Sequence, residues 1–224
     1  MKYKLKFIYL LTIILFYQKQ AQAQELLDEN IKNEHNYAPA TGISGSLLGS
    51  LIHPGFKVAI ERPYKFTQID KHRKHRTKTI YKERYLSYGL GMYHHINYHA
   101  NYFSQTEWVA RRQKSNGYYT ESSLGLGISR TFVDGATFNV SDNGEVNKVF
   151  LAGNWFGLVS AGGALGYNAN LKNKKNYSLY FKYNFLILFP YNSLVTVRPT
   201  IELGFNYNLS GFWEAKPKFK REQK

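Results

Sequence analysis

The chain has 224 residues, with 30 lysines and arginines against 15 acids, a net charge of +15 and no cysteine. Disulfide bonds are therefore excluded. Beyond its first 23 residues the chain has no apolar run near the ~20 residues that a membrane-spanning helix needs. Its mean hydropathy is also negative, at -0.44, so a bundle of such helices is excluded.

Residues 1–23 have the three parts of a secretory signal peptide. A lysine-rich start precedes the apolar run FIYLLTIILFY, and AQA precedes the expected cleavage before Gln24. The apolar run is too short for a membrane anchor, which needs ~20 residues. Removing the signal takes away four lysines and no acid, which leaves a net charge of +11. We therefore expect an exported basic protein, for which anionic surface polymers are more plausible partners than nucleic acid.

The exported chain divides into three parts by composition. Residues 24–41 are polar and are expected to form a periplasmic lead-in, residues 42–209 contain the strand patterns, and residues 210–224 form a polar, basic tail that we expect to be disordered. We expect one domain, because about 200 residues suit a single all-β unit.

Residues 194–209, LVTVRPTIELGFNYNL, have the most regular pattern in the chain. The odd positions are apolar, whereas the even positions from Thr196 onward are polar or small and include Arg198 and Glu202. Side chains alternate between the two faces of a strand, so this period of two predicts one apolar face and one polar face. The run is longer than the ~9–11 residues of a tilted strand that crosses a bilayer. A membrane-spanning strand with its charges inside a barrel is the interpretation that we favour.

Other segments alternate in the same way, and they are residues 56–62, 83–93, 102–111, 122–129, 155–167 and 177–189. Residues 42–52 alternate less regularly. Single-chain barrels have an even number of strands, so residues 42–52 are expected to supply the eighth. The Asp-Gly and Asp-Asn-Gly turns around residues 136–149 predict a polar hairpin outside the membrane. The predicted fold is all-β, a single antiparallel up-and-down transmembrane barrel of about eight strands.

The chain also has 19 tyrosines, 15 phenylalanines and 3 tryptophans, and barrels concentrate aromatic residues at both membrane interfaces. The signal peptide, the strands LSYGLGMY, SSLGLGIS, SLYFKYNF and TVRPTIELGFNYNL, and the aromatic-rich last strand resemble the small outer-membrane β-barrel proteins, including OmpA-like and OmpX-like barrels. The resemblance covers residues 42–209 and implies an outer-membrane location, but it supplies no functional residue. The His-x-Ser-Asn motif of the lipid A deacylase branch does not occur here, which disfavours that activity.

Extending the alternation across the strands predicts a charge network in the lumen. The inward positions with charged side chains are Lys57, Glu61, Glu83, Glu107, Arg111, Glu121, Lys182, Arg198 and Glu202. Acids and bases both occur, so they can pair and stabilise a small barrel.

The most basic segment, residues 65–79, is predicted to be a solvated loop because like charges repel one another. A second interpretation is contact with phosphates of lipopolysaccharide or with another anionic polymer. The residues that would make this contact are Lys71, Arg73, Lys74, Arg76 and Lys78.

His94, His95 and His99 lie near a predicted strand end, and His53 could approach them. Imidazoles bind zinc or copper, but a site needs three converging ligands, and adjacent histidines on a strand point to opposite faces. The sequence therefore predicts no metal site and no cofactor. It also contains no catalytic triad in a recognisable context, so no catalytic residue is expected.

These patterns favour a monomeric, non-enzymatic outer-membrane barrel with a structural or surface-interaction role in the cell envelope and with membrane lipids as its partners. The alternatives are a lipid-acting barrel enzyme, which would need a nucleophile and a base on the lipid-facing rim, and a secretion-accessory barrel.

Overall fold

The computed structural model describes residues 37, 39–50, 53–73, 76–173, 175–191, 194–209 and 217–223. The chain separates into two compact units, Met1–Tyr37 and Ala38–Lys224. The expected signal peptide lies outside the described residues, and the described strands all belong to the second unit. In the described part of the chain, no helix has both the length and the apolar character needed to cross a membrane.

The described strands are β1 (Gly42–Ser50), β2 (His53–Arg73), β3 (Arg76–His95), β4 (His99–Lys114), β5 (Tyr118–Val133), β6 (Thr137–Val140), β7 (Val146–Val149), β8 (Trp155–Asn168), β9 (Tyr177–Tyr191), β10 (Leu194–Asn208) and β11 (Pro217–Gln223). One short helix, α2 (Asn170–Asn173), lies between β8 and β9.

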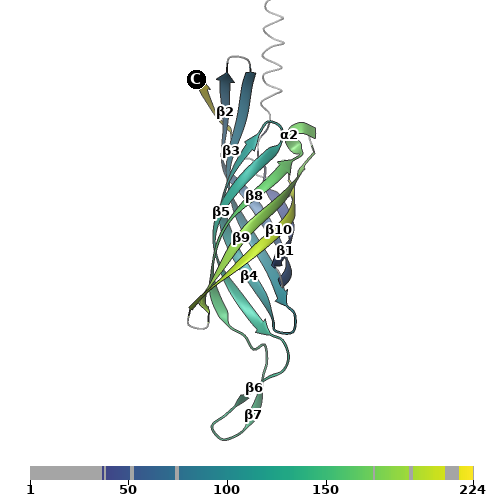
Figure 1. Ribbon diagram of the computed structural model, residues 1–224, viewed down its shortest axis with the longest axis vertical. Helices are drawn as coiled ribbons and strands as arrows, with labels where there is room; N and C mark the ends of the chain where they lie inside the picture. The colour runs from purple at the N-terminus through teal and green to yellow at the C-terminus, as the bar shows by residue number, and fades with distance from the viewer. Residues whose placement is uncertain are drawn as a thin grey trace, which may run out of the picture. The chain divides into compact units, whose positions relative to one another are not determined.

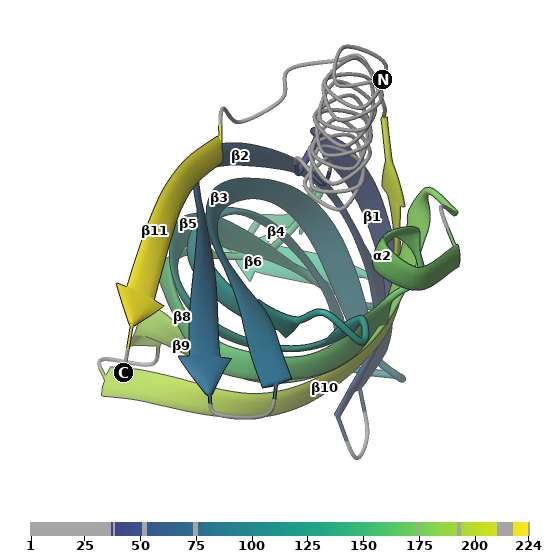
Figure 2. The ribbon, with the colours of Figure 1, turned by 90° about the horizontal axis from the view of Figure 1, so that it is seen from above.

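Within the described residues, eight antiparallel strands close into a ring in the order β1, β2, β3, β4, β5, β8, β9, β10 (Figures 1 and 2). β1 closes the ring, because Gly42 lies opposite Glu61 of β2 and also opposite Asn208 of β10. The expected eighth strand is therefore confirmed. Apart from the β6–β7 hairpin inserted between β5 and β8, each strand pairs with its neighbours in sequence, as an up-and-down barrel requires.

The ring is apolar outside and polar inside. On the outward face, Leu124 and Leu203 are 64% and 60% exposed, whereas the inward Glu107 and Glu202 are each 1% exposed. A soluble protein has the reverse arrangement, because its acids stay in water. The faces follow the sequence: in β10, from Val195 onward, the odd positions point outward and the even positions inward.

The interior is layered along the barrel, and β4 shows the order. His99, Phe103, Glu107 and Arg111 follow one another at four-residue intervals on its inward face. Phe103 belongs to an apolar cluster with Leu48, Tyr93, Phe156, Leu158, Leu186 and Leu188. This cluster therefore separates a charged layer from the histidines at the end of the barrel where β3 turns into β4.

The basic segment is a hairpin and not an irregular loop, which corrects the prediction for residues 65–79. β2 and β3 stay paired as far as Arg73 opposite Arg76. Apolar residues persist among the charges: Phe66, Ile69, Ile80 and Tyr81 are all buried, and the rings of Phe66 and Tyr81 stack with 6.0 Å between their centroids. Burial of these side chains holds the ribbon together despite its charge.

The prediction of a disordered tail is wrong for residues 217–223. They form β11, which pairs in parallel with Phe66–His72 of β2. β2 extends well beyond its pairing with β1, which ends at Glu61. Its outer part would otherwise present unpaired backbone groups, and β11 covers that edge.

β6 and β7 form a separate two-stranded sheet, with Thr137 opposite Val149 and Val140 opposite Val146. This hairpin and the basic hairpin lie at opposite ends of the barrel (Figure 1). Gly144 has a φ of 80°, the left-handed conformation that a glycine in a tight turn adopts easily. The polar hairpin predicted from the Asp-Gly turns is therefore present and lies outside the ring.

Candidate functional site

Glu107 joins two lysines across the lumen. Lys57 Nζ of β2 lies 2.6 Å from Glu107 Oε2, and Lys182 Nζ of β9 lies 2.5 Å from Glu107 Oε1. Lys57 also lies 3.6 Å from Glu202 Oε2 of β10. All four side chains are buried, so this cluster, the Glu107 centre, links strands β2, β4, β9 and β10 through the inside of the barrel.

Arg111 organises a second group of charges, the Arg111 centre. Its guanidinium lies 2.5 Å from Glu121, 3.5 Å from Glu83 and 3.6 Å from Glu61. It also donates a hydrogen bond of 3.1 Å to Tyr85 Oη. The pairing register explains the arrangement, because Glu83 on β3 and Glu121 on β5 flank Arg111 on either side.

Two aromatic rings complete this second centre. The Arg111 guanidinium carbon lies 4.9 Å from the ring centroid of Tyr85 and 4.4 Å from that of Tyr119. Cations are attracted to aromatic faces at such distances. A buried charge is costly unless it is paired with an opposite charge and hydrogen-bonded. Arg111 has carboxylates as ion-pair partners and Tyr85 as a hydrogen-bond acceptor.

The charged layer fills the lumen. The cavity that residues of both centres line has a volume of about 20 Å³, which is room for about one water molecule. Gly125 contributes to this packing, because a Cβ atom there would lie 2.9 Å from Glu107 Cγ. The lumen at this level is packed, whereas a porin keeps a water-filled channel.

The structure brings eight of the nine predicted lumen charges into these two centres, and Arg198 lies apart from them. Its Nη2 atom is 3.5 Å from His99 Nε2, and its guanidinium carbon is 5.0 Å from the ring centroid of Tyr93. The sequence reasoning missed Tyr119, because it selected only charged side chains for the lumen, and Tyr119 is an uncharged residue on the same face of β5 as Glu121.

The basic residues proposed to contact anionic polymers lie on the β2–β3 hairpin. Lys71 of β2 lies opposite Lys78 of β3, and Lys78 is exposed. The side chains of Arg73, Lys74 and Arg76 lie outside the described part of the structure, so their contact with phosphates stays a prediction.

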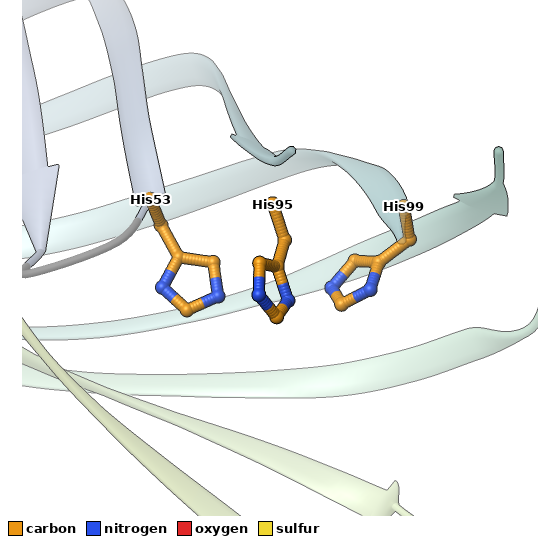
Figure 3. Close-up of side chains that lie close together, drawn as sticks. All are labelled: His53, His95 and His99. Atoms are coloured by element: carbon orange, nitrogen blue, oxygen red, sulfur yellow. The ribbon is translucent and has the colours of Figure 1, made fainter. Parts of the chain in front are cut away.

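Three histidines converge at the other end of the lumen (Figure 3). One ring nitrogen from each of His53, His95 and His99 lies within 4.8 Å of the others. The alternation argument was correct for His94, which points away from this group and lies 2.9 Å from Asp134. It did not anticipate that the first residue of β2, His53, would supply a third imidazole. The premise for excluding a metal site, that three ligands do not converge, is therefore wrong.

A closed antiparallel barrel with an apolar outer face and paired charges inside is the organisation of membrane β-barrel proteins. Solved structures similar to this chain include Neisserial surface protein A (NspA), with 10% identity and a TM-score of 0.44, covering 77% of this chain and 96% of that chain. Another is the β domain of the Bordetella autotransporter Brka, with 10% identity and a TM-score of 0.31, covering 77% of this chain and 100% of that chain. No protein-family model and no curated protein matches the sequence.

Proposed function

We propose that this protein is an outer-membrane barrel with a closed lumen and a non-enzymatic, structural or surface role in the cell envelope. The observation that carries the proposal is the packed, ion-paired interior inside an apolar outer surface. The interior supports a structural role, because side chains that bind one another tightly leave no path for a solute. The exterior supports a membrane location.

The outer surface favours lipid as its surroundings. Large apolar side chains are exposed on every strand of the ring, including Leu47, Ile60, Leu90, Leu126 and Leu203. Soluble monomers rarely expose continuous apolar patches larger than a few hundred Å². In water, exposed apolar side chains raise the free energy of the protein. A bilayer removes this cost, because its hydrocarbon core is as apolar as the side chains themselves.

The ends of the barrel suggest its orientation in the membrane. With the periplasmic lead-in expected at residues 24–41 and an even number of crossings, both ends of residues 42–209 lie on the periplasmic side. The basic hairpin lies at that same end of the ring, and the β6–β7 hairpin lies at the opposite end (Figure 1). In this topology β6 and β7 face the cell surface, where a surface interaction would take place.

Two measurements on the full-length protein test the proposal. Fractionation should place the chain in the outer membrane, with faster gel mobility for the unheated, folded form. Incorporated into planar bilayers, it should give no steady conductance, with a general porin as the positive control. Steady conductance would contradict the closed lumen. Altered lipid A acylation on deleting the gene would instead favour the lipid-acting enzyme.

A further inference from the structure

The three converging histidines come from two turns at one end of the barrel. His53 is the first residue of β2, and His95 and His99 flank the tight turn at residues 96–98. That turn is closed by a 3.0 Å hydrogen bond from the Tyr98 backbone amide to the His95 carbonyl oxygen. His95 and His99 face each other in the strand register. The backbone therefore holds the three imidazoles together.

The rings lie at distances that suit shared coordination. The ring centroids are 4.5 Å apart for His53 and His95, and 5.3 Å apart for His95 and His99. Zinc–nitrogen bonds of ~2.0–2.1 Å place the ligand nitrogens of a tetrahedral site roughly 3.4 Å apart. The ligand atoms of the cluster lie within 4.8 Å of one another, which is up to about 1.4 Å wider than this spacing. The half-buried imidazole rings must therefore rotate toward one another to share an ion.

His53 also offers a ligand atom to a cation. Its Nδ1 atom is buried and has no hydrogen-bond partner among the described residues. Imidazole nitrogens are the commonest metal ligands in proteins.

We propose that His53, His95 and His99 bind one divalent transition-metal ion of the zinc or copper class. Three imidazole nitrogens suit zinc, copper or nickel, whereas calcium and magnesium prefer oxygen ligands. A three-histidine site leaves one coordination position for water. The apolar cluster below the histidines separates this site from the charged layer, so metal binding and closure of the lumen are independent properties.

Arg198 is the feature that opposes the site. Its guanidinium lies 3.5 Å from His99 Nε2, and a fixed cation there repels a metal ion. Arg198 therefore weakens binding, and neutralising it should tighten metal affinity. This opposite effect separates a true metal site from a purely polar cap at the end of the lumen.

Isothermal titration of the full-length barrel, refolded in detergent without a histidine tag and freed of metal with a chelator, tests the proposal. Zn²⁺ should bind with a stoichiometry of one, and Mg²⁺ should not bind. Removing even an outer-shell partner of a metal site costs ~10–100-fold in affinity, so His53→Ala, His95→Ala and His99→Ala should each weaken binding by ~100-fold or more. Arg198→Gln should strengthen it several-fold.

His94→Ala is the matched control, because His94 is the neighbour of His95 and lies outside the cluster. It should leave zinc affinity within about twofold of the wild type. Heat-modifiable gel mobility verifies that each variant folds, and the absorption spectrum of Co²⁺ added to the wild type reports its ligands without any substitution. Absence of one-to-one zinc binding to the wild type would overturn the proposal, as would equal losses in His94→Ala and His95→Ala.

Discussion

Glu107→Gln tests whether the charged layer stabilises the barrel. The substitution keeps the shape of the side chain and removes the charge that neutralises Lys57 and Lys182, whose Nζ atoms lie 2.6 and 2.5 Å from the Glu107 carboxylate. Leaving a buried charge without its partner costs ~3–5 kcal/mol. Lys57 keeps Glu202 at 3.6 Å, so we expect a loss near the lower end, about 3 kcal/mol.

Urea unfolding of the barrel in lipid vesicles measures this loss of unfolding free energy. The fluorescence of the 3 tryptophans reports the unfolding. With a slope of ~1–3 kcal/mol per molar urea, the midpoint should fall by roughly 1–3 M. Glu145→Gln is the control, because Glu145 is exposed in the β6–β7 hairpin, and its midpoint should not change.

The double variant Glu107→Gln with Lys182→Met gives an independent check of the mechanism. Glu107→Gln leaves two buried lysines without the carboxylate that neutralises them. Removing Lys182 as well eliminates one of these unpaired charges, so the double variant should be more stable than Glu107→Gln alone. The reasoning would be refuted if Glu107→Gln unfolded at the same urea concentration as Glu145→Gln. It would also be refuted if the double variant were less stable than Glu107→Gln alone.

Three further predictions concern the outer surface, the topology and the tail. Leu126→Arg should destabilise the barrel in vesicles by ~2–4 kcal/mol because it faces lipid, whereas Val140→Arg, also at an exposed position but on β6, should not; equal effects would remove the reason to place this face in a membrane. On intact cells a protease site inserted at Asn143, in the turn between β6 and β7, should be cut, and one inserted at residues 74–75 should be protected, with the reverse pattern inverting the topology. Truncation after Leu209 should speed hydrogen exchange at the outer backbone amides of β2, and unchanged exchange would mean that β11 does not pair there in solution.

The sequence by itself was sufficient to predict the barrel and to assign the nine lumen charges to its inward face. Side chains alternate between the two faces of a strand with a period of two. The regular alternation of residues 194–209 therefore assigns Arg198 and Glu202 to the inward face without reference to any tertiary contact. The same alternation made the eight-strand count predictable, because a closed ring whose neighbouring strands are all antiparallel needs an even number of strands. It could not state which charges pair, since that depends on the stagger between strands.

Local patterns also misled in two places. The charge of residues 65–79 suggested a loop, because the many charged side chains masked the buried Phe66 and Ile69 among them. The polarity of the tail suggested disorder, because its partner edge on β2 is created only when the ring closes and leaves that strand longer than its neighbour β1.

Only the tertiary structure decided the histidine cluster and the division of the lumen into layers. His53 lies more than 40 positions from His95 in the sequence, and no local periodicity relates them. The barrel brings them together because β2 begins at the same end where β3 finishes, with Gly55 opposite Tyr93. Convergence of ligands from different strands is set by register and closure, which are properties of the whole sheet and not of any one segment.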